Sequence, residues 1–193
     1  HEFGHLLHTL FAGGHQWVGV GGIKTERDFV EAPSQMLEEW VRSPQVLAMF
    51  ASLQDQPSFG YPVSMYRHGV QTATMILRDG HDEETVVIGL LHDFAYDIAP
   101  ETHGAAAAAL FGAFASERND FLLRTHQAFQ SWHCATHPAC DPDERERWRG
   151  HPHFAWVAEF VARYDQVAIA ADGPELPLET FRQALQEIVD QTN

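Results

Sequence analysis

The sequence predicts an all-α protein, and three observations point to that class. Apolar residues recur three or four positions apart through most of the chain, which is the spacing of one face of a helix. No stretch alternates strongly between apolar and polar residues, as a half-buried strand would. Serine, proline and glycine stand at several positions where helices would begin or end.

The first predicted helices lie before residue 54. Residues 1–12 (HEFGHLLHTLFA) carry their leucines along one side and are followed by two glycines, which end the helix. Two helical pieces are expected within residues 25–40, interrupted at Pro33. Residues 43–53 begin with a capping serine and a proline in the first turn, so they form another helix.

A polar, turn-rich stretch, QDQPSFGYP at residues 54–62, separates these helices from a second series. The second series has no internal repeat, and its apolar spacing is helical throughout. Helices are predicted near residues 63–79, 82–97, 102–115, 118–136, 152–167 and 178–191.

Composition narrows the possible partners and location. The 193 residues suit one domain, or a small domain with an appendage. With 27 acidic against 12 basic residues the formal charge is −15, which disfavours nucleic acid and anionic membrane surfaces as partners. Two cysteines are too few for a disulfide framework, and no apolar run reaches the roughly 18–20 residues that span a bilayer. We therefore expect a cytoplasmic protein.

The motif HEFGH at residues 1–5 has the HExxH pattern of zinc peptidases. On a helix, His1 and His5 lie one turn apart on the same face, so both imidazoles can reach one zinc ion. Glu2 can take a proton from water bound to that ion. HExxH by itself recurs by chance, and a third ligand must come from elsewhere in the chain.

The sequence around this motif adds specificity. HEFGHLLH followed by TERDFVEAPSQMLEEWV closely resembles the thimet-oligopeptidase-like (M3) family of zinc metallopeptidases, over about residues 1–51. The resemblance implies zinc ligands His1, His5 and Glu31, with Glu2 as the general base. Peptidases of that family are several times longer and use a downstream tyrosine- and glycine-rich loop, which this sequence lacks. Residues 1–53 are accordingly interpreted as a peptidase-like fragment forming a helical appendage.

A second set of metal-ligand residue types is spread over the later helices. Each of these helices supplies one or two such residues, from its middle or its end, and the pair His92–Asp93 ends the apolar run VVIGLLHD. Two polar residues directly after a buried run are costly unless something binds them. Imidazole and carboxylate groups from several helices are a common ligand set for divalent ions. The candidate ligands are His68, His92, Asp93, His103, His126 and Asp165.

These residues resemble the HD-domain superfamily of metal enzymes, over about residues 59–193. The shared features are a histidine, an HD pair 24 residues later and a distant closing aspartate. His103 and His126 match the six-ligand version, which implies two divalent metal ions with Asp93 bridging them. That branch includes mixed-valent di-iron oxygenases and phosphohydrolases, and iron is the metal expected here. Many relatives carry a glycine and a basic residue after the HD pair, whereas this chain has FAYD; Arg67, Arg124 and Arg163 are the candidates for the missing charge.

The sequence thus predicts an N-terminal fragment (1–53), a linker (54–62) and an HD-type helical bundle (63–193). The expected function is a metal-dependent HD-type enzyme, either an oxygenase or a phosphohydrolase, acting on a small phosphonate, phosphoester or polyol. The alternatives are a zinc endopeptidase that uses HEFGH, and a helical module that binds metal without turnover.

Overall fold

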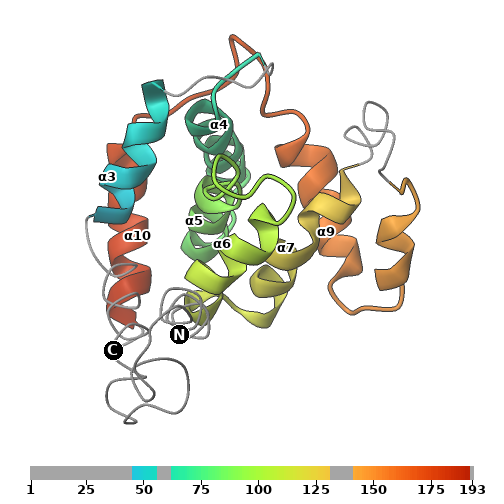
Figure 1. Cartoon of the computed structure of the whole chain (residues 1–193). Helices are drawn as coiled ribbons and strands as arrows, with labels where there is room; N and C mark the ends of the chain where they lie inside the picture. Colours follow the sequence, from blue (N-terminus) through green and yellow to red (C-terminus); the bar gives the residue numbers. More distant parts are fainter. Residues whose placement is uncertain (1–44, 56–61, 131–140, 192–193) are drawn as a thin grey trace, which may run out of the picture. The chain divides into compact units, whose positions relative to one another are not determined.

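A computed structural model describes residues 45–55, 62–130 and 141–191 (Figure 1). Within these ranges every regular element is a helix, so the predicted all-α class is confirmed. The chain divides into two compact units, His1–Val46 and Leu47–Asn193. The boundary thus falls before most of helix α3 (Gln45–Ser52), which the sequence had grouped with the N-terminal fragment up to residue 53. The helices predicted before residue 43 lie outside the described residues.

Helices α4 (Met65–Arg78) and α5 (Glu83–Leu91) pack side by side at the centre of the second unit (Figure 1). Ser64 caps α4 by accepting from the Arg67 amide, and Asp82 caps α5 by accepting from the Thr85 amide. These are the side chains that satisfy the free amides of a first helical turn.

Helix α5 ends at Leu91, not at residue 97 as predicted. Residues 92–98 continue as tight turns, with the amides of Phe94 and Tyr96 each bonded to the carbonyl three residues earlier. The Nδ1 atom of His92 lies 2.9 Å from the Gly89 carbonyl, which would accept the Asp93 amide in a continuing α-helix. The HD pair therefore stands at the end of the helix, where the chain changes direction.

The remaining helices surround this pair. Helix α6 (His103–Phe111) continues into the 3₁₀ turn Gly112–Phe114 and packs against α7 (Glu117–Phe129), which is shorter than predicted. A 3₁₀ segment (Glu144–Trp148) and α9 (Phe154–Phe160) both pack against α7. Helix α10 (Glu179–Gln191) packs against α5. No helix in the described ranges is long and apolar enough to cross a membrane.

Helix α9 passes directly into a π-helical turn, Val161–Asp165, that packs against α4. The wider turn is visible in the bond from the Gln166 amide to the Val161 carbonyl, at 2.9 Å and five residues back. A π turn inserts one extra residue into the helix and rotates the side chains that follow, and such turns are frequent at functional sites. Asp165 is the last residue of this one.

Two glycines allow helices to approach closely beside candidate ligands. A Cβ atom on Gly69 would overlap the Leu90 carbonyl oxygen of α5. One on Gly104 would lie 2.6 Å from the Leu123 carbonyl oxygen of α7. Gly69 follows His68 and Gly104 follows His103, so these contacts bring the histidines of neighbouring helices together.

Candidate metal centre

The structure brings all six predicted ligands of the second set together. They come from five places in the fold: the first half of α4, the end of α5, the start of α6, the second half of α7 and the π-helical turn. Each is buried, with between 0% and 9% of its surface exposed. They form two clusters that share one residue. The four-ligand cluster is His68, His92, Asp93 and Asp165, and the three-ligand cluster is Asp93, His103 and His126.

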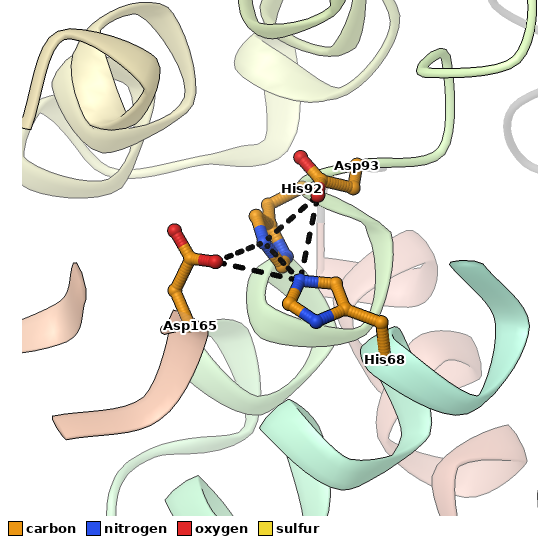
Figure 2. Close-up of side chains that lie close together, drawn as sticks. All are labelled: His68, His92, Asp93 and Asp165. Atoms are coloured by element: carbon orange, nitrogen blue, oxygen red, sulfur yellow. Dashed lines mark hydrogen bonds and ion pairs between the residues drawn. The ribbon is translucent and has the colours of Figure 1, made fainter. Parts of the chain in front are cut away.

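In the four-ligand cluster the side chains point toward a common centre (Figure 2). The Nε2 atoms of His68 and His92 are 3.2 Å apart. Asp93 Oδ2 and Asp165 Oδ1 each lie 3.4 Å from His68 Nε2, and 3.7 and 3.8 Å from His92 Nε2. Atoms that bind one ion at about 2.1 Å stand about 3.0–3.4 Å apart, so these spacings are close to those of a ligand set.

The three-ligand cluster uses the other oxygen of Asp93. Asp93 Oδ1 lies 3.1 Å from both His103 Nε2 and His126 Nε2, and these two nitrogens are 3.0 Å apart. One carboxylate oxygen therefore faces each cluster. This is the arrangement of a carboxylate that bridges two metal ions.

The backbone fixes the tautomer of all four histidines. Each Nδ1 atom faces a carbonyl oxygen, at distances from 2.7 to 3.2 Å; the carbonyls belong to Ala168, Gly89, Pro100 and Leu123. A carbonyl can only accept, so Nδ1 carries the hydrogen and a neutral ring presents a lone pair at Nε2. Pairs of Nε2 atoms 3.0 and 3.2 Å apart would then repel each other unless a cation lies between them.

The buried carboxylates also need positive charge nearby to stay ionised. Burial alone would raise the pKa of Asp93, but the charges of His92 and His103, with hydrogen bonds from His103 and His126, hold it well below its usual range. The pKa of Asp165 is likewise lowered against burial, by hydrogen bonds from His68 and His92. Both carboxylates therefore stay ionised inside the protein.

The negative charges of these carboxylates shift the pKa of the neighbouring histidines. Burial lowers the pKa of His92, but Asp93 and Asp165 outweigh it and raise that pKa to about 9. The pKa of His103 is raised against burial mainly by Asp93, whereas burial lowers the pKa of His126. Without a metal the site thus gathers protons around its carboxylates, and metal ions would replace them. On this chemistry and on the spacing of the ligand atoms, the six residues fit two divalent ions.

A hydrogen-bonded segment supports the His68 side of the site. Residues 168–176 follow the π turn and are attached to α4 at several points. Arg67 bonds the Ala171 carbonyl at 2.8 Å and Glu175 at 2.7 Å, and Gln71 bonds the Ala170 carbonyl at 2.8 Å. These contacts hold the segment whose Ala168 carbonyl orients the His68 ring. Partners of this kind set ligand orientation and metal affinity.

The hydroxyl of Tyr164, a residue of the π turn, bonds to the segment that joins α4 and α5. The Tyr164 hydroxyl donates to Asp79 at 2.8 Å and lies 2.9 Å from His81 Nε2. Burial, together with the bond to Asp79, raises the pKa of Tyr164 to about 12, so the hydroxyl keeps its proton. Tyr164 precedes Asp165, and its anchored ring fixes the backbone that presents this ligand.

The three arginines named as candidates for the missing charge each pair with a carboxylate, and their role beside a substrate stays a prediction. Arg67 pairs with Glu175, Arg124 with Asp120 at 2.8 Å, and Arg163 with Asp79 at 2.9 Å. The Arg124 pair lies within one helix, and the other two pairs join residues that are distant in the sequence. After the HD pair, the Tyr96 ring lies 5.2 Å from the His103 ring.

The residues of the first motif lie outside the described residues. His1, Glu2, His5 and Glu31 are among them, so their zinc site stays a prediction. Motif and spacing alone did not mark Gln130, Tyr164 or the two close-approach glycines as functional. Gln130 stands four residues after His126, and that one-turn spacing was the available signal; Tyr164 is marked only by being next to Asp165.

Comparison with known proteins gives information on the N-terminal part. Residues 1–77 match the model of peptidase family M3. The chain is 53% identical over 51 residues to the dipeptidyl carboxypeptidase of Escherichia coli strain K12, which is 26% of this chain and 7% of that protein. It is 32% identical over 87 residues to the mitochondrial intermediate peptidase of Pleurotus djamor, covering 43% of this chain and 11% of that protein. The corresponding Aspergillus fumigatus protein is 32% identical over 107 residues.

These matches support the metallopeptidase resemblance of residues 1–51. The chain spans only 7–13% of the length of the relatives named. The match also extends to residue 77, across the boundary between the compact units and through most of α4. The HD-type resemblance of residues 59–193 stays a prediction.

Proposed function

We propose that residues 47–193 form a dinuclear metal enzyme of the HD type that acts on a small molecule. One observation carries the proposal: four buried imidazoles, each with Nδ1 committed to a carbonyl, direct their Nε2 lone pairs at the two oxygens of Asp93 and at Asp165. Burying so many polar groups is costly unless cations satisfy them.

The six ligands would be divided between two metal ions. His68, His92 and Asp165 would hold one ion, His103 and His126 the other, and Asp93 both. When bound, such ions supply dioxygen activation if both are iron, or activation of water for attack on a phosphoester. Among the residues that the structure describes, the three-ligand cluster offers fewer ligand atoms, so it would leave more positions open for a substrate.

Metal analysis tests this proposal directly. The full chain, purified without oxygen and without added metal, is expected to carry close to two ions per chain, and Asp93→Ala is expected to carry none. A wild-type chain that binds no iron, manganese or other divalent ion at the six residues would contradict the proposal.

Two enzyme classes remain within the proposal, and oxygen dependence separates them. Oxygen uptake with phosphonate or polyol panels by the iron-loaded chain would identify an oxygenase. Phosphate release from phosphoesters under argon would identify a phosphohydrolase. Two bound ions with neither activity would favour the non-catalytic metal-binding module.

A second candidate function, a zinc peptidase, is favoured by the match of residues 1–77 to peptidase family M3. His1, His5 and Glu31 would hold zinc, and Glu2 would act as the general base. This candidate predicts that Glu2→Gln abolishes peptide cleavage while Asp93→Asn leaves it unchanged. The reverse pattern, or no cleavage by the wild-type chain, would exclude it. The cytoplasmic location and the absence of nucleic-acid partners stay predictions for either function.

A further inference from the structure

Gln130 is not one of the six candidate ligands, but its side chain contacts a ligand of the four-ligand cluster. Its side-chain nitrogen donates to Asp165 Oδ2 at 2.8 Å. The other oxygen, Oδ1, is the one that faces His68 and His92. Asp165 is only 3% exposed, so little solvent is available to replace this donor. Because a carboxylate only accepts, the amide must present its NH₂ group to it.

This bond restricts how Asp165 can serve an ion. A carboxylate free to rotate can present one oxygen or both to a metal. With Oδ2 held by Gln130, Oδ1 alone is directed at the imidazole nitrogens. The contact therefore favours single-oxygen binding and keeps a coordination position from being filled by Oδ2.

Gln130 also links the two clusters through one helix. It follows the last residue of α7, four positions after His126, and its backbone amide bonds the Gln127 carbonyl at 3.3 Å. Helix α7 thus contributes a ligand to the three-ligand cluster and, one turn later, the donor that orients a ligand of the four-ligand cluster.

We propose that Gln130 is a positioning residue that sets the metal affinity of the four-ligand cluster by holding Asp165 Oδ2. The inference rests on the proposed dinuclear site. It predicts that loss of the donor weakens metal binding in that cluster and leaves the three-ligand cluster unaffected. Loss of an outer hydrogen bond to a metal ligand typically weakens binding about 10–100-fold.

The experiment is a Mn²⁺ titration of the metal-free full chain, followed by electron paramagnetic resonance. Gln130→Leu removes the donor at similar size, and Gln130→Glu replaces it with an acceptor that repels Asp165. Each is made in His126→Ala, which retains the four-ligand cluster, and in His68→Ala, which retains the three-ligand cluster. Gln127→Leu is the matched control, because that glutamine lies on the same helix and has no hydrogen bond to either cluster.

In the His126→Ala background we expect about tenfold or greater weakening with Gln130→Leu, and more with Gln130→Glu. In the His68→Ala background neither change should alter Mn²⁺ affinity, and this retained binding would also show that the variants fold. Unchanged affinity in the first background, or equal loss in both, would overturn the role of Gln130 alone. A wild-type chain that binds no Mn²⁺ would instead overturn the dinuclear site.

Discussion

The two clusters share Asp93 but are built over very different sequence distances. The three-ligand cluster joins Asp93 and His103 to His126, which lies 33 and 23 residues further along the chain, and it needs only the end of α5 and the neighbouring α6–α7 pair. The four-ligand cluster also needs the π turn, which supplies Asp165, and the segment after it, because the carbonyl that orients His68 belongs to Ala168, 100 positions later. One cluster is therefore a local structure, and the other depends on closure of the whole unit.

This difference locates the weak point of each cluster. The three-ligand cluster depends on the close contact between α6 and α7 at Gly104. The four-ligand cluster depends on the contacts of α4 with α5 and with residues 161–176. Asp93 belongs to both clusters, so changes there should affect both, whereas a change to any other ligand should affect only its own cluster.

The largest effect is expected for Asp93→Ala. Because its two oxygens face different clusters, the metal content should fall from about two ions per chain to none, measured by inductively coupled plasma mass spectrometry. Asp143→Ala, at an exposed position whose side chain makes no capping hydrogen bond, is the control and should retain both ions. An Asp93→Ala chain that keeps two ions would show that this carboxylate does not bridge.

Removal of one terminal histidine should separate the clusters. We expect His68→Ala and His126→Ala each to retain about one ion, since each variant loses a ligand from one cluster and leaves the other cluster complete. The remaining ion should then be lost from either variant when Asp93→Ala is added. Loss of both ions from a single histidine variant would mean that the clusters fill only together.

Close packing beside the ligands offers a test that replaces no ligand residue. Gly104→Ala should overpack α6 against α7 and lower the free energy of unfolding by about 1–3 kcal/mol, and Gly69→Ala should do the same between α4 and α5. Metal affinity should fall at the three-ligand cluster in the first variant and at the four-ligand cluster in the second. Gly150→Ala, where a Cβ meets nothing within 4 Å, is the control and should be neutral in denaturant titration.

The smallest effect is expected at the start of α5, the helix that carries the HD pair. The Asp82 carboxylate accepts from the amide and hydroxyl of Thr85, and these bonds, with Arg118, lower its pKa although burial opposes this. Asp82→Ala should cost about 1 kcal/mol of unfolding free energy at pH 7. Both clusters should be affected alike, because α5 positions the ligand that they share.

The pH dependence of that effect has a definite sign. A lowered carboxyl pKa contributes stability above the ordinary value of 3.8, and this contribution is lost as the pH falls through the lower, folded value. The difference between wild type and Asp82→Ala in thermal unfolding should therefore shrink in acid. Asp82→Asn keeps the capping oxygen and should lose less stability at pH 7; a loss as large as that of Asp82→Ala would mean that charge, not capping, matters here.

The sequence predicted the helices of the second unit well, but not where two of them end. The helix expected over residues 82–97 stops at Leu91, where the His92 ring contacts the Gly89 carbonyl and the chain turns. The helix expected over residues 118–136 stops at Phe129. Such endings depend on where a side chain finds its partner, which apolar periodicity does not record.

The family match shows a related limit of sequence comparison. It extends through residue 77, yet α4 packs with α5 and the π turn inside the unit that begins at Leu47. A matched range follows similarity along the chain, whereas a structural unit follows which surfaces are buried together.

The sequence by itself determined the helical class and named the six residues that the fold gathers, because residue type and helical setting are properties of the chain. Only the tertiary structure decided that Asp93 directs one oxygen to each cluster, that backbone carbonyls fix the tautomer of the histidines, and that Gln130 holds Asp165. These features depend on side-chain direction and on contacts between distant segments. Periodicity and spacing do not specify them, since each arises only when the helices pack.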